Sequence, residues 1–121
     1  MSRYVLTVNV KDDPGVVQTY RDYHREVWPE VLASLRHAGV DQMDIYMLGR
    51  RLVMVVDTRS GLDYRMAFEK HASSSGRVIE WERLMKSLQE RPAEAAPGEW
   101  WALMEPVFHL DQSAAISGSP E

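Results

Sequence analysis

The chain has 121 residues, 45% of them hydrophobic, no cysteine and a formal net charge of −4. This length favours a single domain with a modest core. The lack of cysteine excludes disulfides and thiolate metal sites, as is usual in a reducing cytoplasm. The acidic balance argues against nucleic acid as a partner, and no apolar run approaches the roughly 20 residues of a membrane span. We therefore expect a cytoplasmic protein that binds neither nucleic acid nor membranes.

The first predicted element is a strand over Arg3–Val10. Its apolar side chains alternate at period two, which is typical of a strand with one face toward a core. The core face comprises Tyr4, Leu6, Val8 and Val10, and the other face comprises Val5, Thr7 and Asn9. Because the second face is mixed in character, it indicates contact either with solvent or with a partly polar cavity.

A long helical pattern runs from about Gly15 to Ala38, after a KDDPG segment whose aspartates can cap a helix. Pro29 interrupts this pattern, because its ring removes a backbone donor and moves Trp28 away from helical dihedrals. We expect a kink, or two helices that meet near Trp28, with Gly39 as the C-terminal stop.

Two strands joined by a short hairpin loop are predicted over Gln42–Leu48 and Leu52–Thr58. The second strand is almost entirely apolar before Asp57, which is typical of a central strand covered on both faces. A second helical region begins near Gly61, and a serine run separates a short helix from a longer one at about Arg77–Gln89.

The last predicted element is a strand over Trp100–Leu110, bulged at Pro106. We place one domain at residues 1–111 and a flexible tail at 112–121, where the composition turns to Ser, Ala, Gly and Pro. The order strand, helix, strand, strand, helix, strand predicts an α+β, ferredoxin-like βαββαβ fold. In this fold a four-stranded antiparallel sheet carries its helices on one face.

The face of the sheet without helices is also predicted to be partly apolar, because Val53, Val55 and Leu103 would lie there. A single domain would expose this apolar patch to water, which is unfavourable. Two copies that pair sheet to sheet would bury it. We therefore expect a homodimer of the dimeric α/β-barrel type.

Three aromatic side chains, Tyr20, His24 and Trp28, recur at i, i+4 and i+8. On a continuous helix they would follow one face, where an indole can stack on an apolar ring face and a phenol and an imidazole can bind hydroxyls. The same spacing is typical of side chains packed in a core, and spacing alone does not separate the two interpretations. Trp81 is likewise either a cavity wall or a packing residue.

Other polar residues fall on predicted strands. Asp57, Glu105 and His109 could line a pocket if they share a face with Thr7 and Asn9, although each is also typical of a strand end or an edge. The four histidines are too dispersed to predict a metal site, and His37 and His71 are expected at the surface. No nucleotide-binding or hydrolase motif is present.

The chain resembles the L-rhamnose mutarotase family in the sequence Tyr20-x3-His24-x3-Trp28-Pro29-Glu30, in LASLRHAGV, in EWERLM and in the closing VFHL. The likeness extends over about residues 3 to 110, and the LGRRLVMVVDT hairpin resembles the L-fucose mutarotase branch. It implies a homodimeric isomerase that interconverts the α and β anomers of a 6-deoxy sugar without a cofactor. It also implies His24 as the proton donor and Tyr20 and Trp81 as substrate contacts.

Two positions depart from the family pattern: Glu82 replaces the second of two tryptophans, and Met43 replaces a tyrosine. Both are substrate contacts in the family, so they bear on which sugar is bound and leave the reaction type intact. We expect His24 to move the proton, Tyr20 to position a hydroxyl, Trp28 and Trp81 to form apolar walls, and Asp57 to assist. Alternatives are a cofactor-independent oxygenase of the same fold and a non-catalytic ligand-binding domain.

Overall fold

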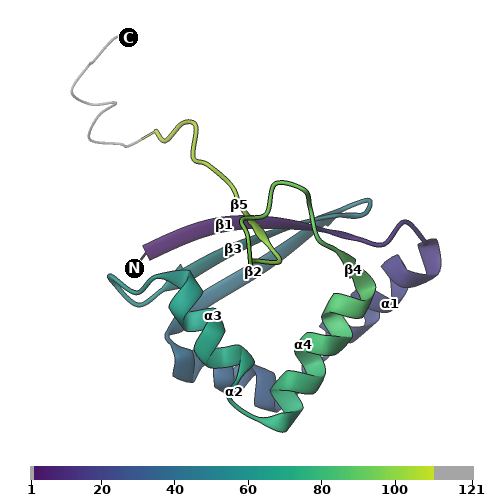
Figure 1. Cartoon of the computed structure of the whole chain (residues 1–121), viewed down its shortest axis with the longest axis horizontal. Helices are drawn as coiled ribbons and strands as arrows, with labels where there is room; N and C mark the ends of the chain where they lie inside the picture. The colour runs from purple at the N-terminus through teal and green to yellow at the C-terminus, as the bar shows by residue number, and fades with distance from the viewer. Residues whose placement is uncertain (1, 111–121) are drawn as a thin grey trace.

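The computed structural model describes residues 2–110 of the chain, and Figure 1 shows the arrangement of its elements. The strands are β1 (Ser2–Val10), β2 (Val40–Leu48), β3 (Arg51–Thr58), β4 (Gln89–Glu90) and β5 (Ala102–Leu103). The helices are α1 (Pro14–Arg25), α2 (Pro29–Ala38), α3 (Tyr64–Ala72) and α4 (Gly76–Leu88).

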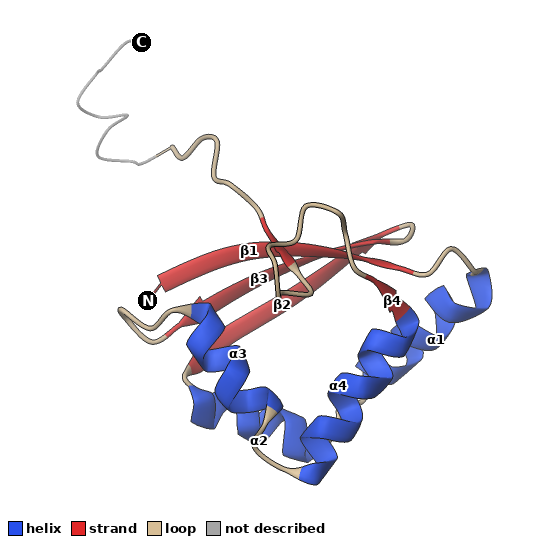
Figure 2. Cartoon of the chain, in the orientation of Figure 1, coloured by secondary structure: helices blue, strands red, loops and turns tan. Residues whose placement is uncertain are grey.

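The sheet has the order β2-β3-β1-β4, and β5 also pairs with β1. All of these pairings are antiparallel, and Figure 2 shows the helices gathered on one face of the sheet. This is the predicted ferredoxin-like arrangement, in which each of the two crossover helices is broken into two pieces.

The helix boundaries follow from the predicted caps. Asp13 is the N-cap of α1 and accepts a hydrogen bond from the Gly15 amide at 2.8 Å. The long helix does stop before Pro29, because α1 ends at Arg25 and Pro29 begins α2. At the end of α2, Gly39 adopts φ of 105°, and a Cβ there would come within 2.3 Å of the Leu62 side chain.

The core lies between the helices and the inner face of the sheet. Leu6, Val8 and Val10 on β1 are fully buried there, as the alternation predicted. On β3 the inner positions Leu52 and Val56 are fully buried as well. Because side chains alternate along a strand, these assignments also fix which residues of β3 face outward.

The predicted strand over Trp100–Leu110 is wrong in its extent. Only Ala102–Leu103 pairs with β1, and the short β4 takes the next part of the same edge. The Met104 amide still donates to the Val5 carbonyl at 2.7 Å, but Pro106 has no amide hydrogen to continue the ladder. Residues 104–110 are exposed, and the predicted tail at 112–121 lies outside the described residues.

The outer face of the sheet carries Val5, Val53 and Val55, all of them partly exposed in the single chain. Tyr46 on β2 pairs with Val53 and is 63% exposed. Leu103 was also predicted to lie on this outer face, and that prediction is wrong. Its register aligns it with Leu6, whose side chain faces the helices. The outer face is therefore apolar along the middle of β1, β2 and β3 without Leu103.

Candidate functional site

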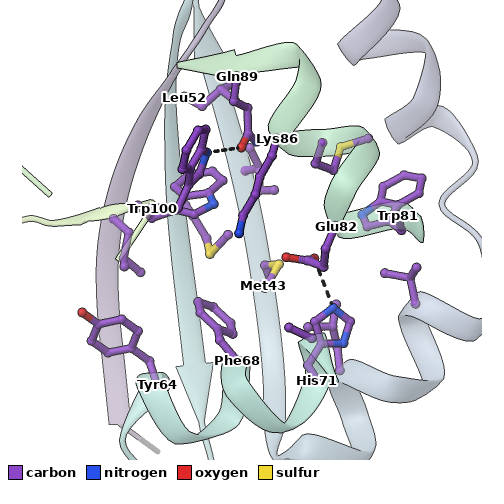
Figure 3. A pocket seen from close by; sticks show the side chains of 18 of the residues that line it. Met43, Leu52, Tyr64, Phe68, His71, Trp81, Glu82, Lys86, Gln89 and Trp100 are labelled. Carbon is purple, nitrogen blue, oxygen red and sulfur yellow. Dashed lines mark hydrogen bonds and ion pairs between the residues drawn. The ribbon is translucent and has the colours of Figure 1, made fainter. Parts of the chain in front are cut away.

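A cavity of about 960 Å³ lies between the inner face of the sheet and the helices. This volume is at the upper end of the usual range for small-molecule sites, roughly 300–1,000 Å³. Figure 3 shows how β2, β3, α3 and α4 surround it. Its lining mixes apolar walls with a few polar groups, among them Tyr20, His24, His71, Glu82, Lys86 and Gln89.

Two of the predicted residues meet on α1 at this cavity. The rings of Tyr20 and His24 are stacked, with centroids 4.2 Å apart and an interplanar angle of 24°. The Nδ1 atom of His24 lies 2.9 Å from the backbone oxygen of Tyr20. A carbonyl oxygen only accepts hydrogen bonds, so Nδ1 carries the hydrogen and Nε2 holds the lone pair of the neutral imidazole.

The protonation states of this pair follow from burial. Burial lowers the pKa of His24 below its ordinary value of 6.5, although the hydrogen bond to the Tyr20 carbonyl acts against this change. Burial raises the pKa of the Tyr20 phenol to about 12; the hydrogen bond from Gln89 opposes this rise and the charge of Glu82 adds to it. Near neutral pH the pair therefore presents a neutral imidazole and a protonated phenol.

The Tyr20 hydroxyl is held by a short chain of side chains. The Gln89 amide nitrogen donates to it at 3.4 Å, and the Gln89 amide oxygen accepts from the Trp100 indole at 2.8 Å. Figure 3 shows the second of these bonds. Since the phenol oxygen accepts from Gln89, its own hydrogen is available to donate toward a ligand.

Trp81 forms an aromatic wall beside His24. Its ring lies 5.5 Å from the His24 ring, measured between centroids, and it is 4% exposed. The predicted wall at Trp28 is not part of the lining, because α1 ends at Arg25 and the continuous helix that the spacing assumed is absent. Trp28 instead packs against Trp81, with ring centroids 5.0 Å apart, and the Arg77 guanidinium lies over the Trp28 ring at 3.7 Å.

Met43 lines the cavity from β2. Its strand alternation places it with Ile45 and Met47 on the face toward the helices. The cavity lies on that same face of the sheet. Met43 can therefore face the helices and also contact a ligand in the cavity.

The structure does not bring Asp57 to the cavity. It lies on the outer face of the sheet, where the Arg3 guanidinium donates to both of its carboxylate oxygens at 2.8 and 3.1 Å. These hydrogen bonds lower the pKa of Asp57. Thr7 shares this outer face, while Glu105 and His109 are in the exposed segment after β5. The predicted pocket built from these residues is therefore absent from the described part of the chain.

His71 was expected at the surface, and this prediction is wrong. It is 4% exposed and lines the cavity from α3, with its Nε2 atom 3.4 Å from a carboxylate oxygen of Glu82. A sequence signal for it exists: Tyr64, Ala67 and His71 are the buried residues of α3, and their spacing is that of an apolar helix face. A histidine on a buried helix face needs a hydrogen-bonding partner, so His71 could have been predicted to contact another polar side chain.

Neither a metal site nor a membrane span appears in the described residues. Among residues 2–110, histidine, cysteine and acidic side chains nowhere gather in a group of three that could hold a metal ion. No helix within the same range is long and apolar enough to cross a bilayer.

Comparisons with known proteins agree with this architecture. A family model described as L-rhamnose mutarotase matches residues 3–110. An L-fucose mutarotase from Xanthomonas campestris pv. campestris is 37% identical over 120 residues, covering 96% of this chain and 94% of that protein.

Two solved structures have the same fold. One is L-rhamnose mutarotase FA22100 from Formosa agariphila, with a TM-score of 0.64 and 17% identity, covering 92% of this chain and all of that one, 100%. The other is a dimeric ferredoxin-like protein from an uncultured marine organism, with a TM-score of 0.51 and 13% identity, covering 90% and 91% of the two chains. At these identities the likenesses show the ferredoxin-like fold.

Proposed function

Because the chain belongs to the L-rhamnose mutarotase family, we propose that it interconverts the α and β anomers of a 6-deoxy sugar, with L-fucose as the preferred substrate. This makes it an isomerase acting on carbohydrates, as the resemblance implied. The preference for L-fucose is supported by the relative of that name at 37% identity. It is also supported by Glu82 and Met43, which change two substrate contacts of the rhamnose-type pattern.

The reaction opens the pyranose ring, turns the aldehyde and closes the ring on the other face. The Nε2 atom of neutral His24 takes the proton of the anomeric hydroxyl while the C1–O5 bond breaks. The O–H electron pair becomes the second bond of the aldehyde, and the C1–O5 pair stays on the ring oxygen. The imidazolium then gives its proton to that oxygen. Closure on the other face reverses these steps, and His24 returns to its neutral form.

One imidazole can serve both oxygens because both are bonded to C1. The lowered pKa of His24 suits this shuttle: the resting imidazole is ready to accept, and the transient imidazolium readily gives the proton up. General acid–base catalysis of this kind contributes about a hundredfold to ten-thousandfold in rate. We assign Tyr20 to hold a sugar oxygen through its protonated hydroxyl and Trp81 to cover an apolar face of the sugar.

The observation that carries this proposal is the position of His24 at the cavity, with Nδ1 2.9 Å from the Tyr20 carbonyl oxygen. Magnetisation transfer between the two anomer signals of L-fucose measures the exchange rate directly. We expect acceleration by the wild type and loss of about a hundredfold or more in His24→Ala. His37→Ala is the matched control, since His37 is exposed on α2. Wild-type exchange in folded His24→Ala would refute the role of His24.

The same assay separates the alternatives. A cofactor-independent oxygenase would consume oxygen with an aromatic substrate and leave anomer exchange at its spontaneous rate. A non-catalytic binding domain would bind a sugar without accelerating exchange. The polar groups around Tyr20, His24 and Glu82 favour a hydroxyl-bearing ligand over a purely aromatic one.

We also propose that two copies pair through the outer face of the sheet, where Val53 and Val55 lie. The similarity to a dimeric ferredoxin-like protein supports this. Sedimentation equilibrium should give twice the mass of the chain for the wild type and the single mass for Val53→Lys, which puts a charge in the apolar row. A single mass for the wild type would rule out the dimer.

A cytoplasmic location stays a prediction from the absence of cysteine.

A further inference from the structure

A second group of polar side chains lies between α3, α2 and α4, and two of its members, His71 and Glu82, line the same cavity. The His71 imidazole is held on one side by the Ser34 hydroxyl, 2.8 Å from Nδ1, and faces Glu82 on the other, 3.4 Å from Nε2. Ser34 is itself fixed by Ser74 at 2.7 Å. Figure 3 shows Glu82 reaching from α4 toward His71. An imidazole held in this way limits where the carboxylate that it faces can lie.

Glu82 and the stacked pair of Tyr20 and His24 line the same cavity from different helices. Trp81 and Glu82 are consecutive on α4, and the Trp81 ring turns to His24 on α1 while the Glu82 carboxylate turns to His71 on α3. The negative charge of Glu82 contributes to the raised pKa of the Tyr20 phenol, so the two groups interact electrostatically across the cavity. The Glu82 side chain is 37% exposed although His71 is buried. Because Glu82 also lines the cavity, a ligand there can reach its side chain.

We propose that Glu82, positioned by His71, binds the sugar hydroxyls on C3 and C4 and so sets the orientation of the substrate. The inference rests on the proposed mutarotase function. When C1 and the ring oxygen lie at His24, the ring atoms opposite them are C4 and C3. An ionised carboxylate accepts hydrogen bonds from both of two neighbouring hydroxyls. The carboxylate of Glu82 is the acceptor of this kind that α4 presents next to Trp81.

His71 acts in this arrangement as a positioning residue. It is buried and is fixed by Ser34, so it limits the directions that the Glu82 carboxylate can take. Hydroxyl recognition by a carboxylate is selective when the bound sugar covers it, since a sugar that lacks the hydroxyl then leaves the carboxylate without its partner. The configuration at C4, which differs between L-fucose and L-rhamnose, should accordingly matter to this protein.

The test measures kcat and KM for anomer exchange with L-fucose and with its 2-deoxy, 3-deoxy and 4-deoxy analogues. We expect Glu82→Gln to raise KM for L-fucose by roughly ten- to a hundredfold, the usual loss for hydrogen bonds to a charged group, with a smaller change in kcat. The effect should shrink for the 3-deoxy or 4-deoxy analogue and persist for the 2-deoxy analogue. Glu80→Gln, which changes an exposed carboxylate on the same helix, is the matched control.

Two variants of His71 test its positioning role. The glutamine of His71→Gln can place a donor near the Nε2 position and face Glu82, whereas the asparagine of His71→Asn can reach only the Nδ1 position and Ser34. We expect His71→Gln to keep KM within about threefold of wild type and His71→Asn to raise it as Glu82→Gln does. Thermal unfolding of each variant separates a change in binding from a loss of folding.

The outcomes distinguish the inference from the function on which it rests. If the wild type exchanges anomers and Glu82→Gln has an unchanged KM, or the same loss for every analogue, the inference is wrong and the mutarotase function stands. The inference is also wrong if His71→Gln and His71→Asn lower the melting temperature alike and leave KM unchanged. If the wild type exchanges no 6-deoxy sugar, the proposed function fails and the inference fails with it.

Discussion

Removal of one oxygen, in Tyr20→Phe, separates the two roles that Tyr20 can have in the cavity. The ring stacks on His24, and phenylalanine keeps that contact. The hydroxyl accepts from Gln89 and has a hydrogen to donate to a sugar, and phenylalanine loses both interactions. If Tyr20 serves only as a wall, exchange should continue at the wild-type rate.

The magnitudes follow from the geometry. The bond from Gln89 is long, at 3.4 Å, and Gln89 keeps its shorter bond to Trp100. We therefore expect Tyr20→Phe to lower the free energy of unfolding by only about 0.5–1 kcal/mol, equal to a few degrees in Tm for a domain of this size. Loss of one hydrogen bond to the substrate should lower kcat/KM by roughly three- to tenfold.

Anomer exchange of L-fucose, measured with urea denaturation on the same samples, tests both numbers. Tyr23→Phe is the matched control, because Tyr23 is a tyrosine of the same helix that packs on Trp81, with ring centroids 6.1 Å apart, and does not line the cavity. We expect Tyr23→Phe to keep the wild-type rate. A Tyr20→Phe variant with an unchanged kcat/KM would refute the assignment of its hydroxyl to the substrate.

Three further predictions follow from the pKa changes and the packing. Burial lowers the pKa of His24, and the neutral form accepts the proton. The value of kcat/KM should therefore rise with pH through a pKa below 6.5 and then level off. A fall in kcat/KM over that pH range would contradict the shuttle. Arg3 lowers the pKa of Asp57, so the stability that this carboxylate contributes is present above its ordinary pKa and is lost as the pH falls through the lowered one. The Tm of the wild type should therefore fall more steeply below about pH 4 than that of Asp57→Asn. Trp81→Ala should cost about 3 kcal/mol in urea denaturation, the lower end for a buried tryptophan, since one side of the ring already faces a cavity.

Much of the fold could be predicted because each signal is local. Alternation on β1 identified Leu6 and Val8 as core residues, and the restrictions at Pro29 and Gly39 placed two helix boundaries. The extent of the last strand was wrong because apolar residues such as Val107 suggested pairing. Apolar character does not supply a ladder partner, and Val107 is 91% exposed in the single chain.

The site was predicted less well because its residues meet through tertiary contacts. The spacing of Tyr20 and His24 made them candidates, but that spacing is more often found in a core, and the family resemblance was needed to favour a site. Asp57 was assigned to the substrate although alternation with the buried Val56 places it on the opposite face of β3. That error could have been avoided from the sequence, because a one-residue step along a strand reverses the face.

His71 and Glu82 show a different limit. The resemblance placed Glu82 at a substrate contact of the family, but nothing in the sequence paired it with His71, because polar residues in helices are usually assigned to a solvated face. What brings them together at one cavity is the serine run between α3 and α4, which ends one helix and caps the next with Ser75. The break lets α4 return past α3, so that Glu82 reaches His71 although eleven positions separate them in the chain, from 71 to 82. The contact between His71 and Glu82 thus depends on where the helix is interrupted. The break before Pro29 acts in the same way, because it ends the helix that carries His24. A pattern read within one continuous helix cannot predict a contact that exists only because the helix stops.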